Sequence, residues 1–149
     1  QGHLVQTLRQ RAQEHGGVVV SVCAKLESEI AELDDVDRWE MLQSLGLDEA
    51  ALGTLTRAAY ETLGLRTFFT TRSSELRAWP FAMGTSAPRA AGLIHSDMQR
   101  GFIRVEVYRV ADLAQYRSEK AIREAGKLRV EGRDYSIQDG DVCRFLFRA

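Results

Sequence analysis

The stretch LRTFFTTRSSELRAWPFAMGTSAPRAAGLIHSDMQRGFIRVEVYRV, residues 65–110, decides the fold. Residues 67–71 and 75–81 are rich in β-branched and aromatic side chains, and the short link 72–74 separates them, so they predict a β-hairpin. The turn residues at 84–88 then predict the start of a helix, because proline is tolerated in a first helical turn.

The predicted helix carries Ala91, Ile94, His95 and Met98 on nearly one face. Alternating residues 102–110 predict a strand, and 111–125 predict short helix and loop. Two further strands are expected, at 127–130 and, after the Asp139-Gly140-Asp141 turn, at 142–147. A hairpin followed by a helix and more strands is the order of a β-grasp, or ubiquitin-like, fold.

The first part of the chain has a different pattern. Residues 4–12 predict an amphipathic helix that ends at His15-Gly16-Gly17, and the β-branched run 18–23 predicts a strand buried on both faces of a parallel sheet. Such a strand needs parallel neighbours, and the sequence offers none. We therefore expect the end of a larger α/β domain, which agrees with a chain that begins without methionine.

Three more helices are expected before the hairpin. Two lie at 26–33 and 36–45, with Asp34 or Asp35 as the N-cap of the second. The third lies at 52–63, capped by Asp48 and ended by Gly64. The predicted fold class is therefore α+β, with a helical and α/β remnant followed by a β-grasp.

Composition excludes several classes. The chain has 149 residues, of which 44% are hydrophobic and 28% charged, and it shows no basic-then-apolar leader pattern and no apolar run long enough to span a membrane. We therefore do not expect a transmembrane, secreted-precursor or disordered protein. Two distant cysteines indicate neither a zinc site nor a disulfide framework, so we expect a reducing, cytoplasmic setting. Residues 1–65 hold five basic and eleven acidic side chains, whereas 66–149 hold fifteen basic and ten acidic.

Few motifs for catalysis are present. The sequence lacks the GxxxxGK[ST] loop that cradles nucleoside triphosphates, the GxGxxG loop and the GxSxG elbow. His95, beside Asp97, could act as a general base or contact a phosphate, but a helix cap is the favoured interpretation. Cys143, inside the last strand, is interpreted as a buried core thiol.

Two sets of residues are candidates for binding. Cys23-Ala24-Lys25 directly follow the predicted strand 18–23, and ligands sit at the carboxyl ends of strands in open α/β sheets. The basic second part interleaves arginines with aromatics, which suits either base stacking and phosphate contact or a half-buried sheet. The aromatics are Phe68, Phe69, Trp79, Phe81, Phe102, Tyr108, Tyr135, Phe145 and Phe147.

The block APRAAGLIHSDMQRGFIR at 87–104 and the block GRDYSIQDGDV at 132–142 resemble the C-terminal part of the YchF family of Obg-related P-loop GTPases. The similarity extends over VVVSVCAKLESEIAELDD at 18–35 and essentially the whole chain. It implies the end of a G domain at 1–42, a helical connection at 43–64 and a TGS domain, itself a β-grasp, at 65–149.

The resemblance also implies roles. Cys23, Ala24 and Lys25 match the last nucleotide-recognition loop of the G domain, usually Ser-Ala-Lys, whose backbone contacts the purine. The full-length family uses ATP or GTP with magnesium and associates with ribosomes and RNA. The phosphate-binding loop is not in this sequence, so no cofactor is expected for the chain alone, and no catalytic residue is carried over.

Our leading hypothesis from the sequence is a fragment whose TGS domain contacts RNA, the ribosome or a regulatory partner of a nucleotide-hydrolysing protein. The alternative is an intramolecular scaffold that positions the G domain and the helical arm. The missing G-domain core is an expected partner, as is a second copy of the chain that pairs with strand 18–23. The expected RNA contacts are Arg66, Arg77, Arg104, Arg129 and Arg133.

Overall fold

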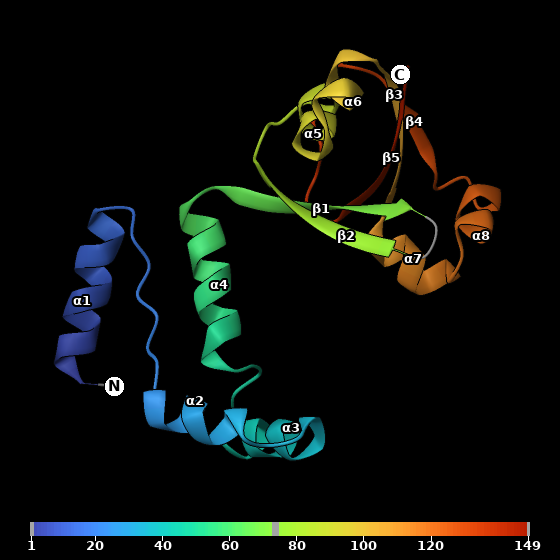
Figure 1. Ribbon diagram of the computed structural model, residues 1–149. Helices are drawn as coiled ribbons and strands as arrows, with labels where there is room; N and C mark the ends of the chain where they lie inside the picture. Colours follow the sequence, from blue (N-terminus) through green and yellow to red (C-terminus); the bar gives the residue numbers. More distant parts are fainter. Residues whose placement is uncertain (1, 73–74, 149) are drawn as a thin grey trace. The chain divides into compact units, whose positions relative to one another are not determined.

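The computed structural model describes residues 2–72 and 75–148, and the chain divides into two compact units, 1–63 and 64–149. The link expected at 72–74 therefore lies partly outside the described residues. The described residues of the first unit form the helices α1 (His3–Glu14), α2 (Ala24–Ala31), α3 (Asp35–Ser44) and α4 (Ala51–Thr62) (Figure 1).

The strand predicted at 18–23 is wrong. Residues 17–23 belong to no helix or strand, and Val18 and Val22 are exposed. A strand is defined by its hydrogen-bonded neighbours, and the first unit has no strand among its described residues.

Local hydrogen bonds fix the helices of the first unit. The Asp34 carboxylate accepts hydrogen bonds from the backbone N–H groups of Val36 and Asp37, both at 3.0 Å, so Asp34 is the N-cap of α3. The cap predicted for α4 at Asp48 is wrong, because Ala50 occupies the N-cap position. A distant carboxylate replaces it, since Glu27 Oε1 accepts from the Ala51 N–H at 2.9 Å.

The second unit is a mixed five-stranded sheet in the order β2-β1-β5-β3-β4. Its strands are β1 (Leu65–Arg72), β2 (Glu75–Ala82), β3 (Phe102–Arg109), β4 (Arg129–Glu131) and β5 (Asp141–Phe147). β1 and β5 are parallel, and the other neighbours are antiparallel. This order, with a helix after the first hairpin, confirms the predicted β-grasp, although β4 lies slightly later than expected.

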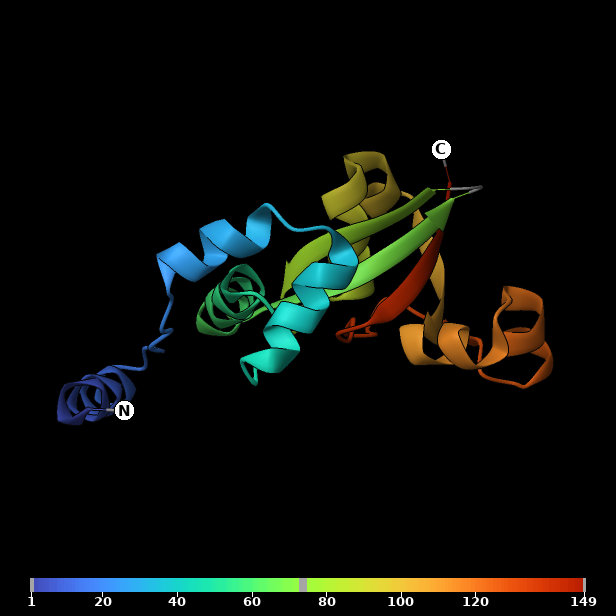
Figure 2. The ribbon, with the colours of Figure 1, turned by 90° about the horizontal axis from the view of Figure 1, so that it is seen from below.

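Helices cover both faces of this sheet. One face packs against α5 (Ala87–Ile94) and α6 (Ser96–Arg100), and the other packs against α7 (Val110–Tyr116) and α8 (Glu119–Glu124) (Figures 1 and 2). The single helix predicted across Ala91 and Met98 is instead two helices. They separate at His95, whose backbone is extended at φ −161°.

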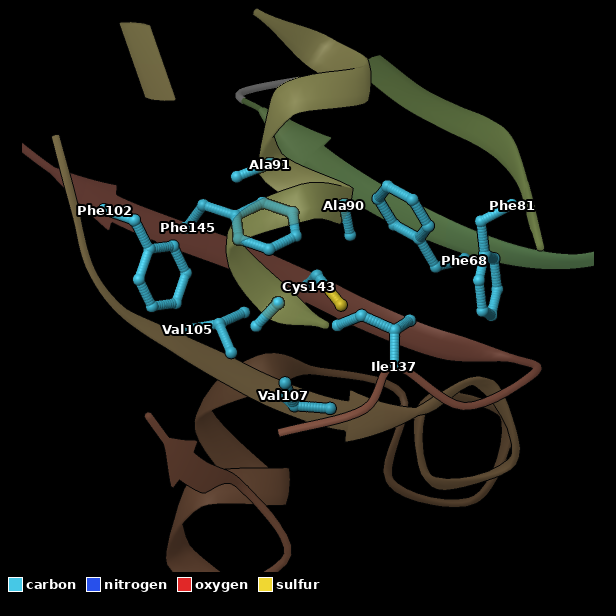
Figure 3. Close-up of a cluster of buried hydrophobic side chains, with 11 residues drawn as sticks. Phe68, Phe81, Ala90, Ala91, Phe102, Val105, Val107, Ile137, Cys143 and Phe145 are labelled. Atoms are coloured by element: carbon cyan, nitrogen blue, oxygen red, sulfur yellow. The ribbon is translucent and has the colours of Figure 1, made fainter. Parts of the chain in front are cut away.

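The main core lies between α5 and the sheet (Figure 3). Phe68 is fully buried at its centre, and its ring contacts those of Trp79, Phe81 and Phe145 at centroid distances of 6.5, 5.8 and 5.9 Å. The α5 side of this core is formed by small residues, Ala87, Ala90 and Ala91, which allow the helix to approach the sheet closely.

Candidate functional site

Cys23, Ala24 and Lys25 lie at the start of α2. Cys23 is the N-cap residue and makes no side-chain cap hydrogen bond, and Ala24 is the first residue of the helix. All three are exposed, and Lys25 forms an i,i+4 ion pair with Glu29 at 3.8 Å. The backbone of this junction is therefore accessible, as contact with a ligand through N–H groups would require.

Two of the five predicted RNA-contacting arginines lie on the β1–β2 hairpin. Arg66 pairs with Phe81 and Arg77 pairs with Thr70 in the antiparallel register. Directly paired residues share a face of the sheet, so both arginines lie on the face that carries the main core, at different positions along the hairpin.

The other three lie elsewhere on the sheet. Arg104 lies in β3 between Ile103 and the buried Val105, so alternation places it on the face opposite the main core. Arg129 begins β4, and the guanidinium of Arg133 lies over the Phe102 ring at 5.8 Å and donates to the Phe102 carbonyl at 3.1 Å. The five arginines therefore occupy both faces and do not form one patch.

The predicted aromatic stacking surface is largely absent from the described residues. Five of the nine aromatics are buried in the two cores, namely Phe68, Phe81, Phe102, Tyr108 and Phe145. A ring buried against other side chains cannot stack on a base. The arginine and aromatic alternation thus reflects mainly a half-buried sheet, with cations in water and rings inside.

A buried carboxylate lies where β3, β4 and β5 meet. Asp141 is completely buried, and its Oδ2 accepts hydrogen bonds from the Tyr135 hydroxyl at 2.7 Å and the Gln138 N–H at 2.8 Å. The Nε of Arg109 and the Nη2 of Arg129 lie 3.7 and 3.8 Å from Oδ1. We call these three charged residues the Arg109–Asp141–Arg129 cluster.

Tyr135 connects two members of this cluster. Its hydroxyl donates to Asp141 and accepts from Arg129 Nη2 at 2.9 Å, and the Arg129 guanidinium lies 5.2 Å from the ring centre. Burial, reinforced by the bond to the carboxylate, raises the pKa of Tyr135 to about 12. Burial alone would lower the pKa of Arg129, but the hydrogen bond to Tyr135 and the nearby Asp141 raise it overall. Tyr135 and Arg129 therefore both keep their protons at neutral pH.

The sequence interpretation did not identify Arg109 or Asp141 as a site. The sequence did contain a sign of a buried carboxylate, because Asp141 is in phase with the core residues Cys143 and Phe145. In the structure Asp141 lies directly opposite Arg109 in the register of β5 and β3. An acidic residue at a core-facing position must have partners that stabilise its burial. The strand register needed to name those partners came only from the structure.

His95 has the predicted capping role. Its Nδ1 accepts a hydrogen bond from the Asp97 N–H at 3.2 Å, which caps the short helix α6. Asp97 in turn pairs with Arg100, and the hydrogen bond from Arg100 lowers the pKa of the Asp97 carboxyl. Cys143 is a buried thiol whose pKa is raised by burial, which confirms its assignment to the core.

Neither a metal centre nor a membrane span is found in the described part of the chain. Residues 2–72 and 75–148 contain no group of three or more His, Cys, Asp or Glu side chains placed to hold a metal ion. Among the same residues, no helix combines the length and apolar character needed to cross a bilayer.

Comparison with known proteins identifies relatives over almost the whole chain. Residues 65–148 match the profile of YchF-GTPase_C, described as a protein of unknown function (DUF933). The chain is 50% identical over 140 residues to the "Ribosome-binding ATPase YchF" of Pasteurella multocida, and 46% identical over 143 residues to the Bacillus subtilis protein of that name. These alignments cover 94% and 96% of the chain but only 39% of each relative.

Solved structures show the same arrangement. The YchF GTPase of Schizosaccharomyces pombe superimposes with a TM-score of 0.83 at 26% identity, over 98% of this chain and 39% of that one. A GTP binding protein from Pyrococcus horikoshii OT3, at 15% identity, shares the fold with a TM-score of 0.66, over 99% of this chain and 42% of that one. The chain thus spans well under half the length of the relatives it matches.

Proposed function

The chain belongs to the YchF-GTPase_C family, and on that premise we propose that it is the C-terminal part of a ribosome-associated ATPase or GTPase that depends on a bound nucleotide. One observation carries the proposal, the 50% identity over 94% of the chain to a protein named as a ribosome-binding ATPase. Such a protein would work in the cytoplasm, where ribosomes are.

In this proposal the second unit is a TGS domain that contacts ribosomal RNA. The excess of basic side chains in residues 66–149 supports a polyanionic partner, because lysine and arginine release counterions when they neutralise phosphates. Since most aromatics are buried, the contacts fall to exposed guanidinium groups such as those of Arg77 and Arg104. Such contacts read the phosphate backbone and carry little base specificity.

Residues 1–42 are proposed as the end of the nucleotide-binding domain, and residues 43–64 as a helical connection to the second unit. The exposed backbone at Cys23, Ala24 and Lys25 would contact the purine of ATP or GTP, whose magnesium and phosphates are bound by parts of the protein outside this sequence.

Ribosome pelleting tests the RNA contact. The chain is mixed with purified ribosomes at increasing salt, and the pelleted fraction of the wild type is compared with that of Arg77→Gln, Arg104→Gln and the double variant. We expect both single variants to reduce pelleting and to flatten its salt dependence. Arg89→Gln, an exposed position on α5, is the matched control for the loss of one charge. Unchanged pelleting of the double variant would contradict the proposed RNA contact.

A specific observation favours a second candidate function, an intramolecular scaffold that positions the G domain and the helical arm. In the register of β2, Leu76, Ala78, Pro80 and Ala82 lie on the face opposite the main core, and all four are exposed. A continuous apolar stripe suits protein packing better than RNA contact. The scaffold predicts that deleting the TGS domain from a longer YchF protein changes nucleotide hydrolysis, while the isolated chain binds no RNA. A stripe of this kind could also support self-association, which light scattering would detect.

A further inference from the structure

The Arg109–Asp141–Arg129 cluster contains an oxygen atom with an unmet hydrogen-bonding capacity. Asp141 Oδ1 is buried and accepts no hydrogen bond from the described residues, whereas Oδ2 accepts two. The two guanidinium groups near Oδ1 are beyond hydrogen-bond distance, at 3.7 and 3.8 Å. A buried carboxylate oxygen held only by two flanking cations is a costly arrangement for stability alone.

The two cations differ in how they are held. Arg129 is fixed by Glu131 at 3.0 Å and by Tyr135 at 2.9 Å. The Arg109 side chain is 53% exposed, and apart from its ion pair with Asp141 no hydrogen bond of its guanidinium is found in the described part of the chain. The ion pair between Asp141 Oδ1 and the Arg109 Nε thus orients the Arg109 guanidinium, and its two terminal nitrogens remain available to a ligand.

We propose that Arg109, with Arg129 beside it, binds phosphate groups of an RNA backbone, and that the buried Asp141 is the positioning residue of this site. Guanidinium groups have the planar fork that matches phosphate oxygens, and a fixed guanidinium loses less side-chain entropy on binding. The inference rests on the proposed function and deepens it, because it adds to the exposed arginines one defined site on the sheet unit that holds the RNA backbone.

The first test measures RNA affinity and its salt dependence. A short fluorescein-labelled oligouridine is titrated with the 149-residue chain, and the wild type is compared with Arg109→Gln and with the control Arg89→Gln. Loss of a charge-assisted contact should weaken Arg109→Gln by about tenfold. The slope of log K against log salt should fall by about 0.7, the value for one phosphate contact on a single strand. Arg89→Gln should match the wild type in both.

The second test separates positioning from net charge. Asp141→Asn makes the chain more positive, so general electrostatic attraction predicts tighter RNA binding, whereas a positioning role predicts weaker binding. Arg109→Lys keeps the charge but loses the fork, and should preserve the salt slope with reduced affinity. Circular dichroism and thermal unfolding confirm that each variant is folded. If Asp141→Asn does not fold, the RNA affinity of Arg109→Lys decides whether a positioned guanidinium or positive charge alone binds the RNA.

The outcomes distinguish this inference from the proposed function. If the wild type binds neither oligouridine nor ribosomes, both are overturned. If it binds but Arg109→Gln keeps the affinity and slope of the wild type, or if Arg89→Gln loses as much, only the site is overturned. Inorganic phosphate should not displace the RNA beyond the effect of chloride at equal ionic strength. Specific displacement would assign the cluster to free phosphate and overturn the RNA assignment.

Discussion

Gly101 and Arg148 are in backbone contact at the edge of the main core. The Arg148 N–H donates to the Gly101 carbonyl at 2.9 Å, and a Cβ at position 101 would collide with the Arg148 carbonyl oxygen. Because the obstacle is backbone directly after β5 and not a flexible side chain, only glycine fits here.

Gly101→Ala should therefore destabilise the second unit. We expect a loss of about 1–3 kcal/mol in the free energy of unfolding, the usual cost of overpacking. Gly132→Ala is the control, because a Cβ there meets no atom within 4 Å. Urea unfolding measures both variants. Equal stability of Gly101→Ala and Gly132→Ala would show that the strand end moves aside without cost.

Phe68→Ala should be among the most damaging substitutions in the sheet unit. Phe68 is fully buried, and three other rings surround it, so the truncation leaves a cavity that the sheet and α5 cannot close. The expected cost is about 3–5 kcal/mol. Leu76→Ala, at a side chain that is 62% exposed, should change the stability by less than about 0.5 kcal/mol. Similar melting temperatures for the two variants would contradict the assigned core.

Asp34→Ala should weaken the helical unit. The substitution leaves the N–H groups of Val36 and Asp37 without their cap, at an expected cost of about 1 kcal/mol. Asp35→Ala removes only an exposed ion pair with Arg38 and should cost less than about 0.5 kcal/mol. Helical circular dichroism during urea unfolding follows this unit. A larger loss of stability for Asp35→Ala than for Asp34→Ala would show that Asp34 is not the N-cap of α3.

Much of the second unit was predictable because its signals are local. The alternation in residues 102–110 and the turn before Pro88 act within a few residues, and both elements form close to where they were expected. The prediction of a strand at 18–23 was wrong for a non-local reason. β-branched residues favour an extended backbone, but a strand also needs neighbouring strands to pair with. His95 broke the expected helix because its side chain caps α6.

The candidate site was less predictable than the fold. The prediction of five RNA-contacting arginines rests on residue type, and the sequence does not show that alternation and strand order place them on both faces of the sheet. The cluster around Asp141 joins three strands and the loop residue Tyr135. Contacts of this kind depend on register across strands that are distant in the chain, and single-sequence patterns carry no register for them.

Tyr135 should make the stability of the second unit fall at high pH. Its pKa is raised from 10.0 to about 12, chiefly by burial and then by its bond to Asp141. Between these values the unfolded chain has lost the phenolic proton while the folded chain keeps it. The folded state then binds more protons, so the free energy of unfolding decreases as the pH rises. Below pH 10 the contribution is fully present.

Tyr135→Phe isolates this effect from the other groups that titrate in the same range. The variant should be less stable at neutral pH, because Asp141 Oδ2 loses one of its two donors, by about 1–3 kcal/mol. The stability difference between wild type and variant should then shrink from pH 10 towards 12, as measured by urea unfolding at each pH. A difference that stays constant over this range would show that the Tyr135 hydroxyl titrates normally, and that the hydrogen bond to Asp141 does not hold its proton.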